Sequence, residues 1–239
     1  MRIDRFLSIN GFGSRKSVKK LFHKSAVKVN DEIVTDYSIN ITGSDVIKVD
    51  DQIIENHEYV TLMLNKPEGY VSSLIDERYP SVMNLIPEKY RKRVRIVGRL
   101  DYDTTGLLLL TDNGILNNRL ASPKYHIDKT YEVTVNHLLK PGLVDIFKAG
   151  NIDIGRGEIA SSAILKIKSD YEADITIHEG KYHEIKRLFG KNSYDVIKLN
   201  RISLGPIKLD VKLGETRLLT EEEYDKLLEL THMKKEECL

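Results

Sequence analysis

The chain reads Gly98-Arg99-Leu100-Asp101-Tyr102-Asp103-Thr104-Thr105-Gly106 and continues directly with Leu107-Leu108-Leu109-Leu110-Thr111. Four consecutive leucines before Asp112-Asn113-Gly114 predict a short, fully buried strand that ends in a turn. The loop that precedes the strand is rich in carboxylates, hydroxyls and glycines. Because a buried strand holds such a loop rigidly, Asp101 is a candidate reactive carboxylate. Asp103 is expected only to form a turn through its own backbone.

This loop resembles the active-site motif of the pseudouridine synthases, specifically the family that includes the RsuA-type small-subunit ribosomal enzyme. In that family the pattern Gly-Arg-Leu-Asp-x-x-Thr-x-Gly-Leu carries the essential aspartate, which corresponds to Asp101. Other motifs of the family are resembled, in the same order along the chain, by Asn65-Lys66-Pro67-Glu68-Gly69-Tyr70-Val71, Lys129-Thr130-Tyr131 and Glu179-Gly180-Lys181-Tyr182-His183-Glu184-Ile185-Lys186-Arg187. Four motifs in order imply the fold and the activity of that family.

The implied reaction turns uridine into its C-glycoside isomer. The bond from ribose C1′ to N1 breaks, the uracil turns, and C5 joins C1′. A carboxylate must attack C1′ or remove a neighbouring ribose proton, and an aspartate is ionised for either role at neutral pH. Neither role needs a metal or a cofactor, so none is expected. The sequence leaves open whether Asp101 is the nucleophile or the base.

The resemblance also implies partners for Asp101. Lys186 is expected to pair with it, with the adjacent Arg187 as the alternative cation, because a positive neighbour favours the ionised carboxylate. The target base must leave its stack to be turned, and Tyr131 is expected to stack against the flipped base. The side chains expected to contact the rest of the substrate are Arg99, which holds the flipped nucleotide, and Arg187, Lys66, Tyr70 and Lys129.

The net charge of +1 conceals a basic N-terminal segment, because residues 1–30 contain eight Lys and Arg against Asp4 alone. The helical spacing of Ile3, Phe6 and Leu7 predicts a first helix that ends at Gly11, and Ser14 is expected to cap a second helix. A hairpin follows over residues 27–34, around a polar turn. This pattern resembles the small RNA-binding domain first seen in ribosomal protein S-four. Its expected RNA contacts are Arg2, Arg5, Arg15, Lys16, Lys19 and Lys20, because a local basic face binds phosphates.

The domains follow from these features. Residues 1–50 are predicted to be the two-helix and hairpin RNA-binding domain, 51–59 a linker, 60–231 the pseudouridine synthase domain, and 232–239 a C-terminal tail. In the larger domain we expect strands at 59–65, 131–135, 163–167 and 173–177, a helix capped by Asp112, and a last helix opened by the capping box Thr220–Glu223. Many strands with few helices indicate an α+β domain with a mostly antiparallel mixed sheet.

Composition narrows the other possibilities. No apolar run approaches the roughly 20 residues of a membrane-spanning helix, no secretory signal is expected, and the lone Cys238 excludes an intrachain disulfide. We therefore expect a cytoplasmic monomer whose partner is ribosomal RNA, without membrane association. Two alternatives stay open: the same chemistry on large-subunit ribosomal RNA or tRNA, and a non-catalytic RNA-binding ribosome-assembly factor. The intact Asp101, Tyr131 and Lys186 disfavour the second alternative.

Overall fold

The computed structural model describes residues 2–24, 26–42, 45–54 and 59–233. The chain divides into two compact units, the first built from the N-terminal 59 residues together with the C-terminal segment that begins at His232, and the second from residues 60–231. In the described part of the chain, no helix has the length and apolar character needed to cross a membrane.

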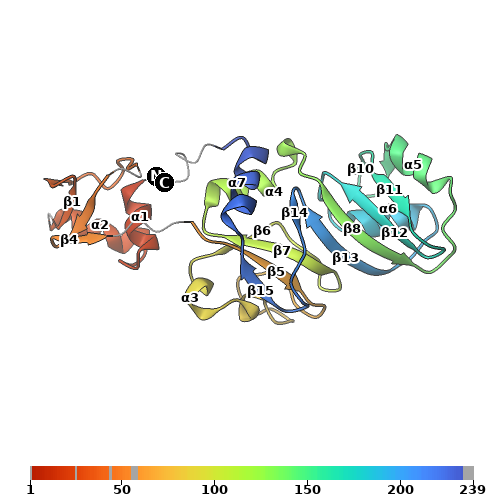
Figure 1. Ribbon diagram of the computed structural model, residues 1–239, viewed down its shortest axis with the longest axis horizontal. Coiled ribbons are helices and arrows are strands. Elements are labelled where there is room, and N and C mark those ends of the chain that lie inside the picture. Colours follow the sequence, from red (N-terminus) through yellow and green to blue (C-terminus); the bar gives the residue numbers. More distant parts are fainter. Residues whose placement is uncertain (1, 25, 43–44, 55–58, 234–239) are drawn as a thin grey trace. The chain divides into compact units, whose positions relative to one another are not determined.

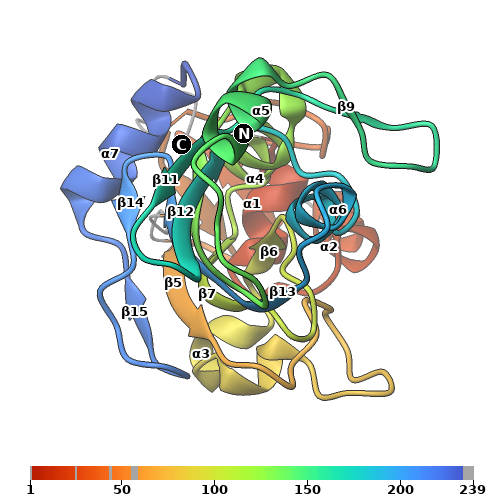
Figure 2. The same cartoon turned by 90° about the vertical axis from the view of Figure 1, so that its right-hand side faces the viewer.

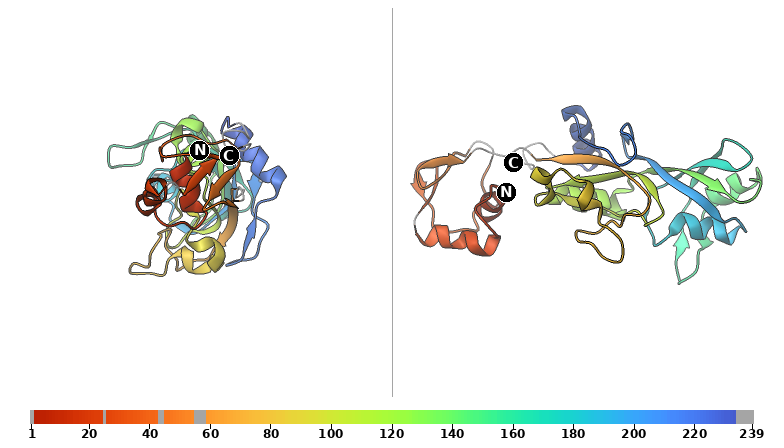
Figure 3. Two further views of the ribbon diagram at one scale, coloured as in Figure 1. Left: turned by 90° about the vertical axis from the view of Figure 1, so that its left-hand side faces the viewer. Right: turned by 90° about the horizontal axis from the view of Figure 1, so that it is seen from below.

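The first unit contains two helices and a small sheet (Figures 1 and 3). Helix α1 (Ile3–Ile9) and helix α2 (Arg15–His23) form as expected, and the Ser14 hydroxyl caps α2 by accepting the backbone N–H of Ser17. The sheet order is β2-β1-β3-β4. The strands are β1 (Val27–Val29), β2 (Glu32–Ile33), β3 (Ile47–Val49) and β4 (Gln52–Ile54). The predicted helices and hairpin are confirmed.

The prediction that residues 51–59 form a linker is wrong for its first part. Gln52–Ile54 pair antiparallel with β3 and complete the sheet. The acidic residues Asp50 and Asp51 have φ angles of 49° and 63°, like Asn30 and Asp31 in the other hairpin, at 50° and 69°. Two successive left-handed residues make the tight turn that suits a two-residue hairpin. The acidic stretch is therefore a turn, and residues 55–58 lie outside the described residues.

The second unit is built on one large mixed sheet in the order β11-β12-β8-β13-β7-β5-β15, with β14 paired to β13 and β6 to β7. Only the β7–β13 pair is parallel among the described strands, which confirms the mostly antiparallel sheet. The strands are β5 (Thr61–Lys66), β6 (Arg95–Val97), β7 (Thr105–Thr111), β8 (Lys129–Val135), β11 (Ile164–Ile167), β12 (Glu172–Ile177), β13 (Val196–Leu204), β14 (Ile207–Lys208) and β15 (Thr216–Leu218).

Short helices surround this sheet, and a separate hairpin extends from it (Figure 2). Helix α4 packs on β6 and β7, α5 on β11, and α6 on β13. The helices are α3 (Glu88–Arg91), α4 (Gly114–Ala121), α5 (Leu143–Ala149), α6 (Glu184–Lys191) and α7 (Glu221–Leu230), with 3-10 turns at Val82–Leu85 and Pro123–Tyr125. The hairpin consists of β9 (Ile152–Asp153) and β10 (Ile159–Ala160).

The helix ends show one confirmed and one incorrect expectation. Helix α7 opens with the expected capping box between Thr220 and Glu223. Helix α4, however, is capped by Asn113, whose side-chain oxygen accepts the backbone N–H groups of residues 115 and 116 at 3.1 Å. The Asp112 carboxylate is buried instead, where it accepts the backbone N–H of Val60 at 2.9 Å and pairs with Arg93. Asp112 thus links the end of β7 to the start of β5 instead of capping α4.

The parallel pairing of β7 with β13 determines where the loop that carries Asp101, residues 98–106, lies. The side chains of Leu107 to Leu110 are completely buried, as predicted for this strand. Gly106 pairs with Arg201 and has a φ of +104°, and a Cβ added there would lie 2.3 Å from the backbone oxygen of Arg201. Only glycine permits so close an approach of two backbones. This approach brings the loop before β7 beside β13, and β13 in turn pairs with β8.

Candidate active site

The loop that carries Asp101 joins β6 to β7. Lys66, in the motif at residues 65–71, holds this loop in place. The side chain of Lys66 is completely buried, and its ammonium donates to the backbone oxygens of Pro67 at 3.1 Å, Tyr102 at 3.3 Å and Thr104 at 2.8 Å. Burial lowers the pKa of Lys66 to about 8. The Lys66 ammonium thus fixes the residues that follow Asp101 in the chain.

A second clamp acts on the other side of the loop. The Ser72 hydroxyl donates to the Leu100 backbone oxygen at 2.8 Å and accepts the Leu100 N–H at 3.0 Å. The N–H of Gly69 donates to the Tyr102 oxygen at 3.1 Å. Because these bonds satisfy the loop's backbone, the Asp101 side chain is left to face the pocket.

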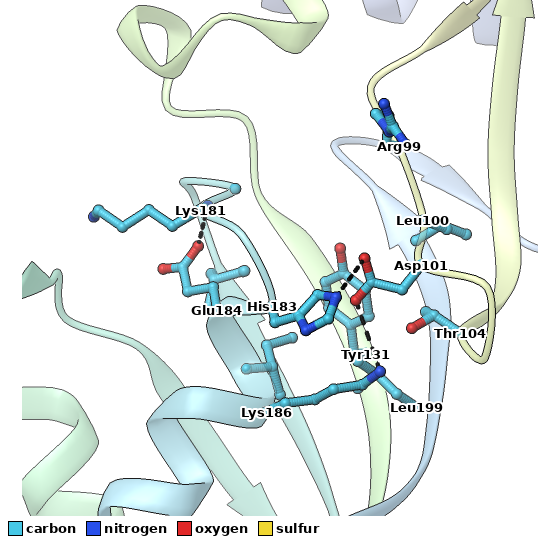
Figure 4. A pocket seen from close by; sticks show the side chains of 13 residues that line it. Arg99, Leu100, Asp101, Thr104, Tyr131, Lys181, His183, Glu184, Lys186 and Leu199 are labelled. Atoms are coloured by element: carbon cyan, nitrogen blue, oxygen red, sulfur yellow. Dashed lines mark hydrogen bonds and ion pairs between the residues drawn. The ribbon is translucent and has the colours of Figure 1, made fainter. Parts of the chain in front are cut away.

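Two basic side chains from the start of α6 approach the Asp101 carboxylate (Figure 4). Lys186 Nζ lies 3.7 Å from one carboxylate oxygen, and His183 Nε2 lies 3.5 Å from the other. The three side chains keep between 23% and 35% of their surface exposed, so solvent reaches the group. The predicted pairing of Lys186 with Asp101 is present as a long contact.

The shorter contact of Lys186 is with Asp103, which had been expected only to form a turn. Lys186 Nζ lies 2.5 Å from the Asp103 carboxylate. Partial burial alone would raise the pKa of Asp103, but the hydrogen bond and charge of Lys186 outweigh burial and hold it below its ordinary value. Asp101 and Asp103 therefore share one ammonium group, which places a positive charge between two carboxylates.

Tyr131 and Arg99 complete the pocket around Asp101. Tyr131 lies on β8, 7% exposed, and Figure 4 shows it behind the Asp101–His183 contact. Arg99 is exposed and points away from Asp101. The pocket is lined by Arg99, Leu100, Asp101, Thr104, Tyr131, Ile177, Gly180, Lys181, His183, Glu184, Ile185, Lys186 and Leu199. Apolar and aromatic surface faces a carboxylate flanked by two basic side chains, an arrangement that suits a flipped base presented for chemistry at its sugar.

Other predicted substrate-binding residues lie elsewhere. Lys66 is buried beneath the loop and donates to backbone oxygens, so the prediction that it lines the RNA track is wrong. Tyr70 packs against the hydrophobic core and lines neither hollow beside Asp101. Lys129 donates to the backbone oxygens of Ile127 and Glu179, both at 3.2 Å, and burial followed by the charge of Arg201 lowers its pKa. It does line the adjoining hollow.

Arg187 also has a structural environment, contrary to the expectation that it would bind substrate or pair with Asp101. Its guanidinium pairs with Glu158 at 2.5 Å and donates to the backbone oxygens of Ile154 at 2.9 Å, Gly155 at 2.5 Å and Tyr182 at 2.9 Å. It therefore pins the β9–β10 hairpin to the turn that precedes α6. One step along the helix rotates a side chain by about 100°, which separates Lys186 from Arg187.

Sequence reasoning missed His183 and the role of Asp103. His183 lies in the motif at residues 179–187 and Asp103 in the loop at residues 98–106, but nothing in their spacing distinguishes them from turn formers. His183 precedes α6 with a left-handed φ of 49°. The adjacent Glu184 is buried. Burial raises the pKa of its carboxyl group, and a hydrogen bond with Glu179 raises it further. Only the folded chain brings His183 to the loop of residues 98–106.

Known proteins match this arrangement over nearly the whole chain. Residues 60–191 match the family described as RNA pseudouridylate synthase, and residues 1–47 match the S4 domain. The chain belongs to the RNA pseudouridylate synthase family. The ribosomal small subunit pseudouridine synthase A of Haemophilus influenzae is 39% identical over 95% of this chain and 100% of that protein.

Two further relatives extend the comparison. The ribosomal large subunit pseudouridine synthase B of Bacillus subtilis is 34% identical over 95% of each chain. A crystal structure of a pseudouridylate synthase superposes with a TM-score of 0.68 at 37% identity, covering 95% of this chain and 99% of that one. The protein is thus a pseudouridine synthase that isomerises uridine in RNA. This finding decides against a non-catalytic assembly factor.

Proposed function

We propose that this pseudouridine synthase converts a specific uridine of small-subunit ribosomal RNA. The observation that carries the proposal is the 39% identity, over 95% of the chain and all of the relative, with a small-subunit enzyme. A ribosomal RNA substrate implies that the enzyme acts in the cytoplasm. Since Asp101, Tyr131 and Lys186 all come from one chain, the site needs no second copy, and we propose a monomer.

Each side chain of the pocket has a role in this proposal. Asp101 acts at ribose C1′, as nucleophile or base, and Lys186 supplies a positive charge 3.7 Å from its carboxylate. The shared contact with Asp103 holds the Lys186 ammonium beside Asp101. Tyr131 stacks against the flipped uracil, and the exposed Arg99 holds the nucleotide at the mouth of the pocket. Tyrosine suits this place because its ring is apolar while its hydroxyl tolerates a polar edge.

The first unit supplies a second RNA contact. Lys16 and Lys20 lie on the exposed face of α2, and Lys19 Nζ lies 4.2 Å from the centre of the Tyr37 ring. Two of the three arginines of the predicted set, Arg2 and Arg15, both bind the buried Asp4 carboxylate at 3.0 Å, so part of their charge is neutralised within the unit. We therefore assign phosphate binding first to the three lysines.

Mapping of pseudouridine tests the proposed target. Ribosomal RNA is compared between cells that lack the gene, cells that carry it, and cells that carry only Asp101→Asn. The expected result is one pseudouridine in small-subunit RNA that disappears in the deletion and is restored by wild type but not by the variant. Loss of a site in large-subunit RNA alone would overturn the small-subunit assignment.

The second candidate target is large-subunit ribosomal RNA. It is favoured by one observation, the 34% identity with the large-subunit enzyme of Bacillus subtilis over 95% of both chains. The difference between 34% and 39% identity is small, so the mapping experiment includes both ribosomal RNAs.

A further inference from the structure

The isomerisation moves one proton as well as one bond. When C5 of the uracil joins C1′, C5 still carries its hydrogen, and N1 has lost its bond to the sugar. The hydrogen on C5 must leave as a proton, so that its electron pair restores the C5–C6 double bond, and N1 must gain a proton. One proton leaves and one is gained, so no oxidant or reductant is needed. A group beside Asp101 that can accept and release a proton would serve both steps.

We propose that His183 is this proton-transferring residue. Its Nε2 lies 3.5 Å from the Asp101 carboxylate and its ring lines the pocket in front of Tyr131. N1 and C5 both bond to C1′ in turn, so both must reach the place where Asp101 acts, within a few ångströms of Nε2. An imidazole accepts and releases protons near neutral pH, which suits a group that must do both. This inference rests on the proposed role of Asp101 at C1′.

Two other titratable groups of the pocket, Lys186 and Glu184, are engaged elsewhere. The Lys186 ammonium is shared by two carboxylates, and a cation so held is not a proton acceptor. The Glu184 carboxyl faces Lys181 in Figure 4, accepting its backbone N–H at 2.9 Å, and also shares a hydrogen bond with Glu179. The Tyr131 phenol lines the same pocket, but a phenol is a weaker base than imidazole at neutral pH. Tyr131 is therefore the competitor that the experiment must distinguish.

The structure holds the His183 ring in a defined position. The ring stacks on Tyr182 with centroids 3.9 Å apart and an angle of 15° between the planes. The Arg156 guanidinium lies over the Tyr182 ring, 4.5 Å from its centre, and Arg187 binds the Tyr182 backbone oxygen at 2.9 Å. The backbone of His183 is left-handed, with φ at 49°, a conformation that costs energy for a residue other than glycine. Strain of this kind is kept where the surrounding structure demands one side-chain position.

The test is the isotope effect at C5 under single-turnover conditions. The substrate is the RNA fragment on which wild type is first shown to be active, prepared with hydrogen or deuterium at C5 of uridine. A failure of the small-subunit assignment would then leave this experiment intact. In His183→Gln we expect pseudouridine formation to slow by about 10²-fold or more. Removal of the C5 proton should become limiting, so the variant should show a larger deuterium isotope effect than wild type.

Three controls make the outcomes decisive. His178→Gln removes a histidine that lies outside the pocket, and its rate and isotope effect should match those of wild type. Imidazole added to His183→Ala should restore part of the rate, and RNA affinity should change little. A slow His183→Gln with the wild-type isotope effect would show that His183 only positions Asp101, and the proposal would be wrong. It would also be wrong if Tyr131→Phe, and not His183→Gln, raised the isotope effect.

Discussion

The burial of the Lys66 ammonium predicts how the stability of the folded protein depends on pH. Lys66 is fully buried, and burial lowers its pKa from 10.5 to about 8. The unfolded chain therefore binds more protons than the folded chain between these two values, and stability must rise with pH across this window. In Lys66→Met this contribution is absent. The free energy of unfolding of wild type minus that of the variant should increase as the pH rises.

The size of the increase follows from the shift. Lowering the pKa of Lys66 from 10.5 to about 8 corresponds to about 3.5 kcal/mol, because each pKa unit is worth about 1.4 kcal/mol. Integration from pH 7 to about 9.5 gives a gain of roughly 2 kcal/mol, because Lys66 is by then deprotonated in the folded state only. At pH 7 two effects oppose each other in the variant. Three backbone oxygens lose their donor, each worth roughly 1–3 kcal/mol, and an unfavourable buried charge is removed.

Urea unfolding of both proteins at several pH values between about 7 and 9.5, followed by far-UV circular dichroism, measures this difference. The slope of free energy against urea should stay the same in both proteins, so that the midpoints report stability. The comparison cancels the titration of groups common to both. A difference between the proteins that stays flat over this range would refute the inference that Lys66 is a buried cation beneath the loop.

Three further predictions concern catalysis and RNA binding. Asp101→Asn should abolish turnover with RNA affinity nearly unchanged, and Asp103→Asn should slow turnover less; activity of Asp101→Asn within about tenfold of wild type, about 1.4 kcal/mol, would contradict its role. Lys186→Met should lower kcat, whereas Arg187→Met should lower the melting temperature, as measured by kinetic assays and thermal unfolding. The reverse result would exchange the roles assigned to these two residues. Neutralising Lys16, Lys19 and Lys20 with Gln should flatten the log–log salt dependence of RNA binding by about 0.7–0.9 per lost phosphate contact, while kcat at saturating RNA survives; an unchanged slope would show that this face only meets solvent.

Local patterns were sufficient for most elements of the fold. The four leucines at 107–110, the Ser14 cap and the capping box at Thr220 each depend on neighbours within about four residues, and each is confirmed. Where the expectation was wrong, a distant partner had intervened. Asp112 does not cap a helix because the backbone N–H of Val60 and the side chain of Arg93 bind its carboxylate. Asp50 and Asp51 form a hairpin turn because residues 52–54 pair with β3.

For the site, the sequence by itself determined the chemistry, through a motif with Asp101, Tyr131 and Lys186 that the structure brings to one pocket. Only the tertiary structure decided which cations face that carboxylate. Lys66, His183 and Arg187 are polar residues in the motifs, yet one lies beneath the loop, one faces Asp101 and one pins a hairpin. The physical reason is that a charge gains its energy from groups within a few ångströms, and those groups are brought together by strands far apart in the chain. Here the close approach of Gly106 to Arg201 places the Asp101 loop beside β13.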